Sequence, residues 1–183
     1  MSKRMNTKGD FTVNLILTGP SGSGKSTALR RVLAQLGEPV CGFWTEKLIR
    51  GVPSPVFLHD CRAPLRYTPE QIVGAPKDGY MAAFPATFDT LGAASLRDLP
   101  QNAVVLMDEL GFLESKAPVF QAAVISVLDS GRRVLAAIGD RDTPFLNAVR
   151  MHRSCVCIDA AQARSDGFIA LALDLLSCVN RKK

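Results

Sequence analysis

Apolar residues along this chain occur in two patterns, short continuous runs and helix-like spacings, and the two alternate. Residues 11–18 form a mostly apolar run that ends at a glycine-rich turn. From Leu29 onward, apolar residues follow at i+3, i+4 and i+7, which predicts one face of a helix that Gly37 can end in a left-handed cap. The first part of the chain therefore predicts a strand, a glycine loop and a helix, in that order.

Similar patterns predict the remaining elements. Continuous runs predict strands at 103–107, 133–138 and 154–158, and helical spacings predict helices at 88–99, 120–128, 144–151 and 168–179. Thr87 or Asp89 is expected to cap the helix at 88–99. Strands that alternate with helices favour an α/β fold, which we expect to be three-layered with a mainly parallel central sheet.

Two segments depart from this alternation. Residues 40–49 and 56–59 have the pattern of strands and flank a Gly-Val-Pro-Ser-Pro connection that is too short for a crossover helix, so we expect an antiparallel hairpin. Residues 61–85 are rich in proline and are predicted to be irregular. No linker or internal repeat divides the sequence, and residues 1–183 are expected to form a single domain.

The formal net charge is +5, from 22 basic and 17 acidic residues. Six of the basic residues lie in residues 1–9 and 181–183, and without these six charges the net charge of +5 becomes −1. We expect both segments to be flexible basic tails. The rest of the sequence shows no basic helix face, so a specific nucleic-acid partner is not expected.

The apolar runs are far shorter than the roughly 20 residues needed to cross a bilayer, so no membrane association is expected. The N-terminal segment leads into the glycine-rich turn instead of a small-residue cleavage site, so we expect no export signal. The five cysteines are Cys41, Cys61, Cys155, Cys157 and Cys178. They lack the paired spacing of a zinc site, and we interpret them as reduced thiols of a cytoplasmic protein.

The glycine-rich turn fits the phosphate-loop pattern G-x-x-x-x-G-K-[ST] at every fixed position. The expected nucleotide-binding residues are Gly19, Pro20, Ser21, Gly22, Ser23, Gly24, Lys25, Ser26 and Thr27. Glycines allow the backbone N–H groups to curl around phosphate oxygens, Lys25 places a cation on the β- and γ-phosphates, and Ser26 offers its hydroxyl to Mg²⁺. The turn follows a predicted strand and opens a predicted helix, which is the context that this motif requires.

A pair of carboxylates directly follows the apolar run at 103–107. Asp108 and Glu109 would lie at the carboxyl end of a buried strand, where open α/β sheets bind their ligands. We expect Asp108 to hold Mg²⁺ together with Ser26, and Glu109 to orient and deprotonate the attacking water. The alternative is a pair of charges at the start of a helix.

An arginine commonly stabilises the charge that builds on the γ-phosphate during its transfer. Arg50 and Arg141 are our candidates for this catalytic role, and the alternative for each is a solvated surface residue. A kinase lid would place two or three arginines in one segment. Arg141, Arg150 and Arg153 are only loosely clustered, which favours hydrolysis over transfer to another acceptor.

Four segments together are more specific than the phosphate loop alone. They are residues 19–27, Gly-Phe-Trp-Thr-Glu at 42–46 with Arg50 behind it, Val-Val-Leu-Met-Asp-Glu-Leu-Gly-Phe-Leu-Glu at 104–114, and Val-Leu-Ala-Ala-Ile at 134–138. In these segments the chain resembles the nucleoside-triphosphatase family called THEP1, over roughly residues 11–178. The resemblance implies a RecA-like phosphate-loop fold and Mg²⁺-dependent hydrolysis of several nucleoside triphosphates, ATP and GTP among them, to the diphosphate and phosphate.

The chain also departs from the family pattern. It carries Gly-Asp-Arg-Asp at 139–142 and Ala-Arg-Ser-Asp at 163–166, and it is rich in proline after Gly51. These departures bear on base recognition and on sensing of the γ-phosphate. Phe43 and Trp44 either stack on a base or pack within the hairpin. The remaining polar candidates, Glu114, His59 and His152, are interpreted as non-catalytic.

The expected function is therefore that of a cytoplasmic Mg²⁺-dependent nucleoside triphosphatase. The sequence does not identify a protein partner. Two alternatives stay open. One is a nucleotide or small-molecule kinase, which would need a pocket for the second substrate, with residues 61–85 as the candidate segment. The other is a nucleotide-gated binding module whose hydrolysis is vestigial.

Overall fold

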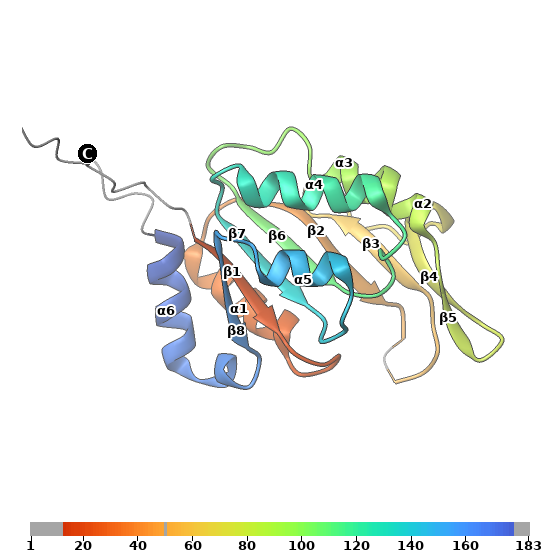
Figure 1. Cartoon of the computed structure of the whole chain (residues 1–183), viewed down its shortest axis with the longest axis horizontal. Helices are drawn as coiled ribbons and strands as arrows, with labels where there is room; N and C mark the ends of the chain where they lie inside the picture. Colours follow the sequence, from red (N-terminus) through yellow and green to blue (C-terminus); the bar gives the residue numbers. More distant parts are fainter. Residues whose placement is uncertain (1–12, 50, 178–183) are drawn as a thin grey trace, which may run out of the picture.

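A computed structural model describes residues 13–49 and 51–177, which form an eight-stranded sheet with helices on both faces (Figure 1). The strands lie in the order β5-β4-β3-β2-β6-β7-β1-β8. Their bounds are β1 Asn14–Thr18, β2 Val40–Lys47, β3 Val56–Asp60, β4 Ile72–Lys77, β5 Tyr80–Ala83, β6 Val104–Leu110, β7 Val134–Ile138 and β8 Cys155–Asp159. The predicted basic tails and the start of the first predicted strand, at residues 11 and 12, lie outside the described residues.

One half of the sheet is parallel. Strand β1 pairs with β7 and β8, and β6 pairs with β7 and β2, all in the parallel sense. The carboxyl ends of β1 and β6 therefore meet at one edge of the sheet with β7 between them. The α/β fold with a mainly parallel RecA-like sheet is confirmed, and its strand order brings the two predicted motifs to the same edge.

The other half of the sheet is antiparallel. The expected hairpin is confirmed, because β2 pairs with β3 from Phe43 opposite Asp60 to Lys47 opposite Val56. The prediction that residues 61–85 are irregular is wrong for β4 and β5, which extend this half as a second hairpin. Its sequence lacks the β-branched alternation of a typical strand, but its turn is an Asp-Gly pair, with φ of 47° at Asp78 and 82° at Gly79. A two-residue Asp-Gly turn is a strong hairpin signal, and the sequence analysis did not use it.

Four predicted helices are confirmed, namely α1 Lys25–Leu36, α4 Pro118–Asp129, α5 Pro144–Arg150 and α6 Asp166–Ser177. Gly37 ends α1 with φ of 62°, and its N–H donates to the Leu33 carbonyl at 3.2 Å. Short 3₁₀ turns, η1 Pro69–Gln71 and η3 Gln162–Arg164, lie in the connections. Within the described residues, no helix has the length and apolar character needed to traverse a membrane.

The helix predicted at 88–99 begins and ends earlier than expected. It consists of α2 Pro85–Thr87, the π-helical turn η2 Phe88–Gly92 and α3 Ala93–Ser95. Neither predicted cap is correct, because this segment starts at Pro85. The Asp89 carboxylate instead accepts a hydrogen bond from the backbone N–H of Phe120 at 2.9 Å, and so ties this segment to the first turn of α4.

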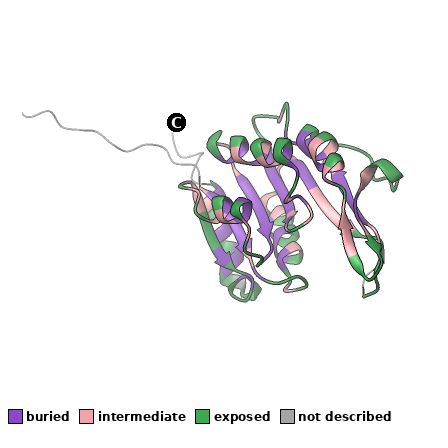
Figure 2. Ribbon diagram, turned by 45° about the vertical axis from the view of Figure 1, so that its right-hand side comes forward, coloured by how far each residue is buried: buried purple, intermediate pink, exposed green. Residues whose placement is uncertain are grey.

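Alternation along the strands builds two apolar cores, one on each face of the sheet. Ile16 packs in a cluster with α4, α5 and η2, whereas its neighbours Leu15 and Leu17 pack in a cluster with α1 and α6. Figure 2 shows the result, buried central strands flanked by helices whose outer faces are exposed. The two cores hold the parallel strands rigidly, and the loops at their carboxyl ends rest on this support.

Candidate functional site

The phosphate loop connects β1 to α1. Residues Gly19–Gly24 form the loop, and Lys25, Ser26 and Thr27 form the first turn of the helix. Gly24 adopts φ of 98° directly before the helix, a conformation that residues with a side chain rarely adopt. The Ser23 hydroxyl oxygen is buried and has no hydrogen-bond partner. A buried unpaired donor at a helix N-terminus is suited to an anion, so the loop fits the phosphate group expected there.

Lys25 is folded back onto the loop. Its side chain is only 2% exposed, and its Nζ lies 3.1 Å from Glu109 Oε1. The same Nζ donates to the carbonyl oxygens of Gly19 at 2.7 Å and Pro20 at 2.8 Å. The strand order thus brings the first predicted motif into direct contact with the second.

A second contact joins the two motifs. The Ser26 hydroxyl donates to Asp108 Oδ1 at 2.8 Å. Asp108 is buried, and burial raises the pKa of its carboxyl, while the Ser26 hydrogen bond and the charges of Arg30 and Lys25 act in the opposite direction. A serine hydroxyl beside a buried carboxylate supplies two oxygen ligands of the kind that Mg²⁺ takes together with substrate phosphates and water. The two residues therefore fit the metal ion that the sequence predicts.

Glu109 lies at an irregularity in the sheet. The register between β6 and β7 shifts between Asp108 and Leu110, so Glu109 has no partner residue in β7. Its backbone N–H donates to Thr45 Oγ1 at 3.3 Å, and its side chain is 29% exposed. Burial raises the pKa of the Glu109 carboxyl, Lys25 lowers it, and the charges of Asp108 and Asp140 raise it further. The carboxylate is thus held next to Lys25 with some access to water.

The two predicted arginines are not both placed by the structure. Arg50 lies outside the described residues. Arg141 follows β7, and its guanidinium carbon lies 5.4 Å from the ring centroid of Phe112. This cation–π contact joins the Arg141 side chain to the turn after β6.

Two other arginines lie near the loop: Arg30, which the sequence did not single out, and Arg164, which it marked only as part of a departure from the family pattern. Arg164 Nη2 donates to the Ser23 carbonyl at 3.4 Å, and Arg30 contributes to the electrostatic environment of Asp108. Both had a usable signal. Arg30 lies four residues after Ser26, on the same face of the helix, and Arg164 follows the strand that borders β1.

The two alternatives for the aromatic pair separate in the structure. Phe43 is fully buried, and its ring lies edge-on to that of Phe120 with centroids 5.3 Å apart, so it belongs to the core. Trp44 is half-buried, has the His59 ring 4.4 Å from its own, and borders a cavity. Phe43 packs as the core alternative predicts, and Trp44 remains accessible to a ligand.

Glu114 and the histidines take structural positions. The Glu114 carboxylate is buried and accepts the Gly111 N–H in the turn after β6, and burial raises its pKa to about 7. Burial lowers the pKa of His59. The His152 ring contacts the Ser154 hydroxyl at 2.8 Å and Asp129 at 3.4 Å. The contacts of Glu114 and His152 are those of structural side chains, whereas His59 is buried with no hydrogen-bond partner at its Nε2, which lies 4.0 Å from Glu46 Oε2.

Comparison with known proteins agrees with this geometry. The family model NTPase_1, described as NTPase, matches residues 14–166. The "Nucleoside-triphosphatase THEP1" of Thermofilum pendens is 31% identical over 137 residues, which are 71% of this chain and 75% of that protein. The protein of the same name from Natranaerobius thermophilus is 28% identical over 163 residues, covering 84% of this chain and 90% of the relative.

A solved structure shares the fold. The crystal structure of THEP1 from Aquifex aeolicus superposes with a TM-score of 0.73 and covers 90% of this chain and 99% of that one, at 22% sequence identity. The similarity at this level of identity concerns the arrangement of strands and helices. Together with the family model and the sequence relatives, it means that the chain belongs to the THEP1-type nucleoside-triphosphatase family.

Proposed function

We propose that the protein is a Mg²⁺-dependent nucleoside triphosphatase that hydrolyses ATP, GTP and other nucleoside triphosphates to the diphosphate and phosphate. The proposal rests on two contacts that join the β1–α1 segment to β6. Lys25 touches Glu109, and Ser26 touches Asp108. A phosphate-binding cation, a metal-binding pair and a candidate base therefore converge on one point of the sheet edge.

The proposed roles follow from the chemistry of these groups. Lys25 would exchange its contacts with Gly19 and Pro20 for oxygens of the β- and γ-phosphates. Ser26 and Asp108 would hold Mg²⁺, which supplies charge neutralisation on the phosphate oxygens when it is bound. Ser23 would donate its unpaired hydroxyl to a phosphate oxygen.

Glu109 is the proposed general base. Its carboxylate would accept a proton from water as the water oxygen bonds to the γ-phosphorus and the bond to the diphosphate oxygen breaks. Burial raises the pKa of the Glu109 carboxyl, and the charge of Lys25 opposes this effect and so favours the ionised carboxylate that this step requires. The hydrogen bond from the Glu109 N–H to Thr45 fixes the backbone behind it. The products are the nucleoside diphosphate and inorganic phosphate.

We further propose that the protein hydrolyses nucleoside triphosphates with different nucleobases. The contacts that define the site, at Lys25, Ser26, Asp108 and Glu109, all address the triphosphate and its metal rather than the base. A transferred γ-phosphoryl group is stabilised mainly by such contacts. Phosphate release is therefore expected with ATP, GTP, CTP and UTP.

The proposed compartment is the cytoplasm. Cys41, Cys61, Cys155 and Cys157 are free thiols in the part of the chain that the structure describes. Unpaired cysteines are typical of proteins kept in reducing surroundings, which supports this assignment.

The test measures phosphate release from each of the four triphosphates, with Mg²⁺ and with a chelator. We expect release from more than one base that depends on Mg²⁺ and is lost, together with triphosphate binding, in Lys25→Ala. Lys116→Ala, which removes an exposed lysine in the turn before α4, is the matched control and should behave as the unmodified protein. Tight triphosphate binding without release would contradict hydrolysis and favour a binding module, and release only after an acceptor is added would favour a kinase.

A further inference from the structure

A cavity of about 420 Å³ adjoins Asp108. Its lining is Arg30, Trp44, Glu46, Cys61, Leu65, Tyr67, Leu106 and Asp108. None of these residues belongs to the loop at 19–24. The volume lies within the range of about 300–1,000 Å³ that small-molecule sites occupy, so the cavity can hold a compound of nucleoside size.

The lining combines aromatic faces with a carboxylate. Tyr67 donates its hydroxyl to Glu46 Oε2 at 2.9 Å, and its ring lies 5.2 Å from that of Phe57. Trp44 has the buried His59 ring on one side, and the guanidinium carbon of Arg30 lies 5.7 Å from its ring centroid. Arg30 is exposed on α1 and so can move away from the Trp44 ring when an anion is offered to it.

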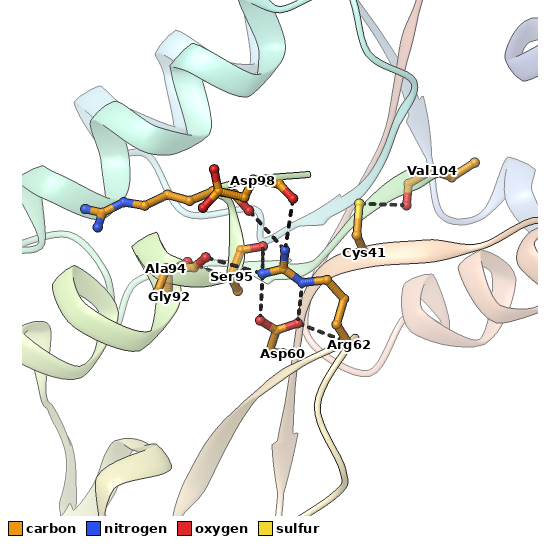
Figure 3. A network of polar contacts seen from close by, with 9 residues as sticks. Cys41, Asp60, Arg62, Gly92, Ala94, Ser95, Asp98 and Val104 are labelled. Carbon is orange, nitrogen blue, oxygen red and sulfur yellow. Dashed lines mark hydrogen bonds and ion pairs between the residues drawn. The ribbon is translucent and has the colours of Figure 1, made fainter. Parts of the chain in front are cut away.

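The wall formed by residues 61–67 is anchored to the rest of the fold. Arg62 forms an ion pair with Asp60 at 2.9 Å and donates to carbonyl oxygens at the end of α3, including that of Arg97 at 3.0 Å (Figure 3). Figure 3 shows this guanidinium between the end of β3 and the helical segment. The proline-rich stretch beside the cavity is therefore held in place, as a preformed binding site requires.

The cavity lies on the β6 side of the phosphate loop, since its lining includes Leu106 and Asp108 of β6. Strand β6, which carries Glu109, is on one side of β1, and β8 is on the other. Arg164 contacts Ser23 from the β8 side. A triphosphate whose γ-phosphate faces Glu109 would extend its nucleoside toward β8, whereas the cavity is walled by β2, β6 and the segment after β3. The cavity is thus separate from the place where the base of that triphosphate would lie.

We propose that this cavity binds a second nucleotide, a nucleoside 5′-monophosphate, beside the bound triphosphate. The base would lie between the rings of Trp44 and Tyr67 and stack on Trp44. Its N–H groups would donate to the Glu46 carboxylate. Arg30 would leave the Trp44 ring and pair with the monophosphate. The inference rests on the proposed function only for the direction in which the triphosphate lies.

The site is connected to the catalytic centre through β2. Trp44 and Glu46 line the cavity, and Thr45 between them accepts the backbone N–H of Glu109 at 3.3 Å. Asp108 borders the cavity on one side and binds Ser26 on the other. A ligand in the cavity would therefore touch the strand that holds the proposed base, which gives the Gly-Phe-Trp-Thr-Glu segment a reason to combine these residue types.

Tryptophan fluorescence provides a direct test, because Trp44 is the single tryptophan of the chain. AMP, GMP, CMP and UMP, and the corresponding nucleosides, are titrated into the unmodified protein. We expect a saturable change in Trp44 emission with at least one monophosphate, and weaker binding of its nucleoside. Glu46→Gln should weaken binding of the monophosphate about 10-fold or more, as expected when a hydrogen bond to a charged group is lost.

Three further variants keep the result interpretable. Tyr67→Phe should also weaken the monophosphate, whereas Tyr80→Phe, which changes an exposed tyrosine on β5, should leave binding unchanged. Lys25→Ala should lose triphosphate binding and keep the monophosphate response, so that failure of the proposed hydrolysis and failure of this site are told apart. Absence of a saturable response at millimolar monophosphate, or loss of the response in Lys25→Ala, overturns the proposal.

Discussion

The Lys25 ammonium and the Glu109 carboxylate lie 3.1 Å apart, so the cation of the phosphate loop is paired with the proposed base. Lys25 also donates to two carbonyl oxygens of its own loop. A triphosphate has to replace part of these contacts when its phosphates reach Lys25. In the proposed mechanism, the phosphates take the place of the two carbonyl oxygens, and the Glu109 carboxylate stays beside Lys25.

This pairing leads to a prediction for Glu109→Gln. Phosphate release should fall by about 10²–10⁴-fold, the usual contribution of a general base. The dissociation constant for ATP should stay the same or decrease, because a neutral amide competes less strongly than a carboxylate for Lys25. Single-turnover phosphate release and equilibrium binding of a fluorescent ATP analogue measure the two quantities. Glu70→Gln, at an exposed position in η1, is the control, and turnover of Glu109→Gln within a few-fold of the unmodified protein would rule out this base.

Asp108→Asn should separate stability from activity. Burial raises the pKa of the Asp108 carboxyl, so the ionised form is disfavoured in the folded protein. An amide keeps an oxygen for the Ser26 hydroxyl and removes the buried charge, so the metal-free variant should melt at a higher temperature than the unmodified protein. The Mg²⁺ concentration for half-maximal phosphate release should rise about 10-fold or more. Thermal melting without metal tests the first expectation, and a Mg²⁺ titration of phosphate release tests the second. A lower melting temperature of the variant would contradict the first.

Much of the fold could be predicted because its central strands are continuous apolar runs and its helices are amphipathic. Strand β6 follows the apolar run at 103–107, and α1 follows the spacing from Leu29. The β4–β5 hairpin could not be found from apolar pattern, since Gly74, Ala75 and Pro76 carry neither large nor β-branched side chains. Its signal was the conformation that Asp78-Gly79 imposes on a turn.

The site was predictable where a motif fixes both residue type and spacing. Lys25, Ser26, Asp108 and Glu109 meet as expected because parallel strands place their carboxyl ends together. The contact of Arg30 with Trp44 could not be predicted, because it joins α1 to β2 and depends on how the helix crosses the sheet. The cavity likewise depends on the β3–β4 connection, whose path no local pattern determines.

Glu114 predicts a dependence of stability on pH. Burial raises its pKa from 4.5 to about 7 in the folded protein. A carboxyl with a raised folded-state pKa contributes stability that is fully present below its unfolded pKa and is lost as the pH rises through the folded pKa. The free energy of unfolding should therefore decline between about pH 4.5 and pH 7 by up to about 3 kcal/mol from this group alone.

Glu114→Gln isolates that contribution. The amide oxygen can still accept the Gly111 N–H, but the side chain no longer titrates. Urea unfolding at a series of pH values should show a smaller decline in the variant and higher stability than the unmodified protein at pH 8. Equal slopes of the two stability curves would show that Glu114 is not the group responsible.

Gly42 of β2 lies opposite Leu106 of β6. It adopts φ of 93°, and a Cβ atom there would lie 2.2 Å from the Leu106 carbonyl oxygen. Gly42→Ala should therefore destabilise the protein by at least about 3 kcal/mol, from backbone strain and from separation of the two strands. Gly167→Ala, at an exposed position of α6 with no crowding, should be neutral or slightly stabilising. Urea unfolding compares the two variants, and a loss below 1 kcal/mol at Gly42 would be incompatible with this packing.

Arg164 predicts a change in substrate affinity with little change in turnover. Its guanidinium contacts the Ser23 carbonyl at 3.4 Å, so it lies beside the loop that surrounds the phosphates in both the ground state and the transition state. Interactions of that kind lower KM without raising kcat, and Arg164→Ala should raise KM for ATP about 10-fold while kcat changes less than 3-fold. Arg141→Ala is the comparison, because Arg141 contacts Phe112 and is the predicted catalytic arginine that the structure describes. If Arg141→Ala lowers kcat by about 10³-fold or more, Arg141 supplies the positive charge to the transition state. If Arg164→Ala instead lowers kcat with KM unchanged, that role belongs to Arg164 and the ground-state assignment is wrong.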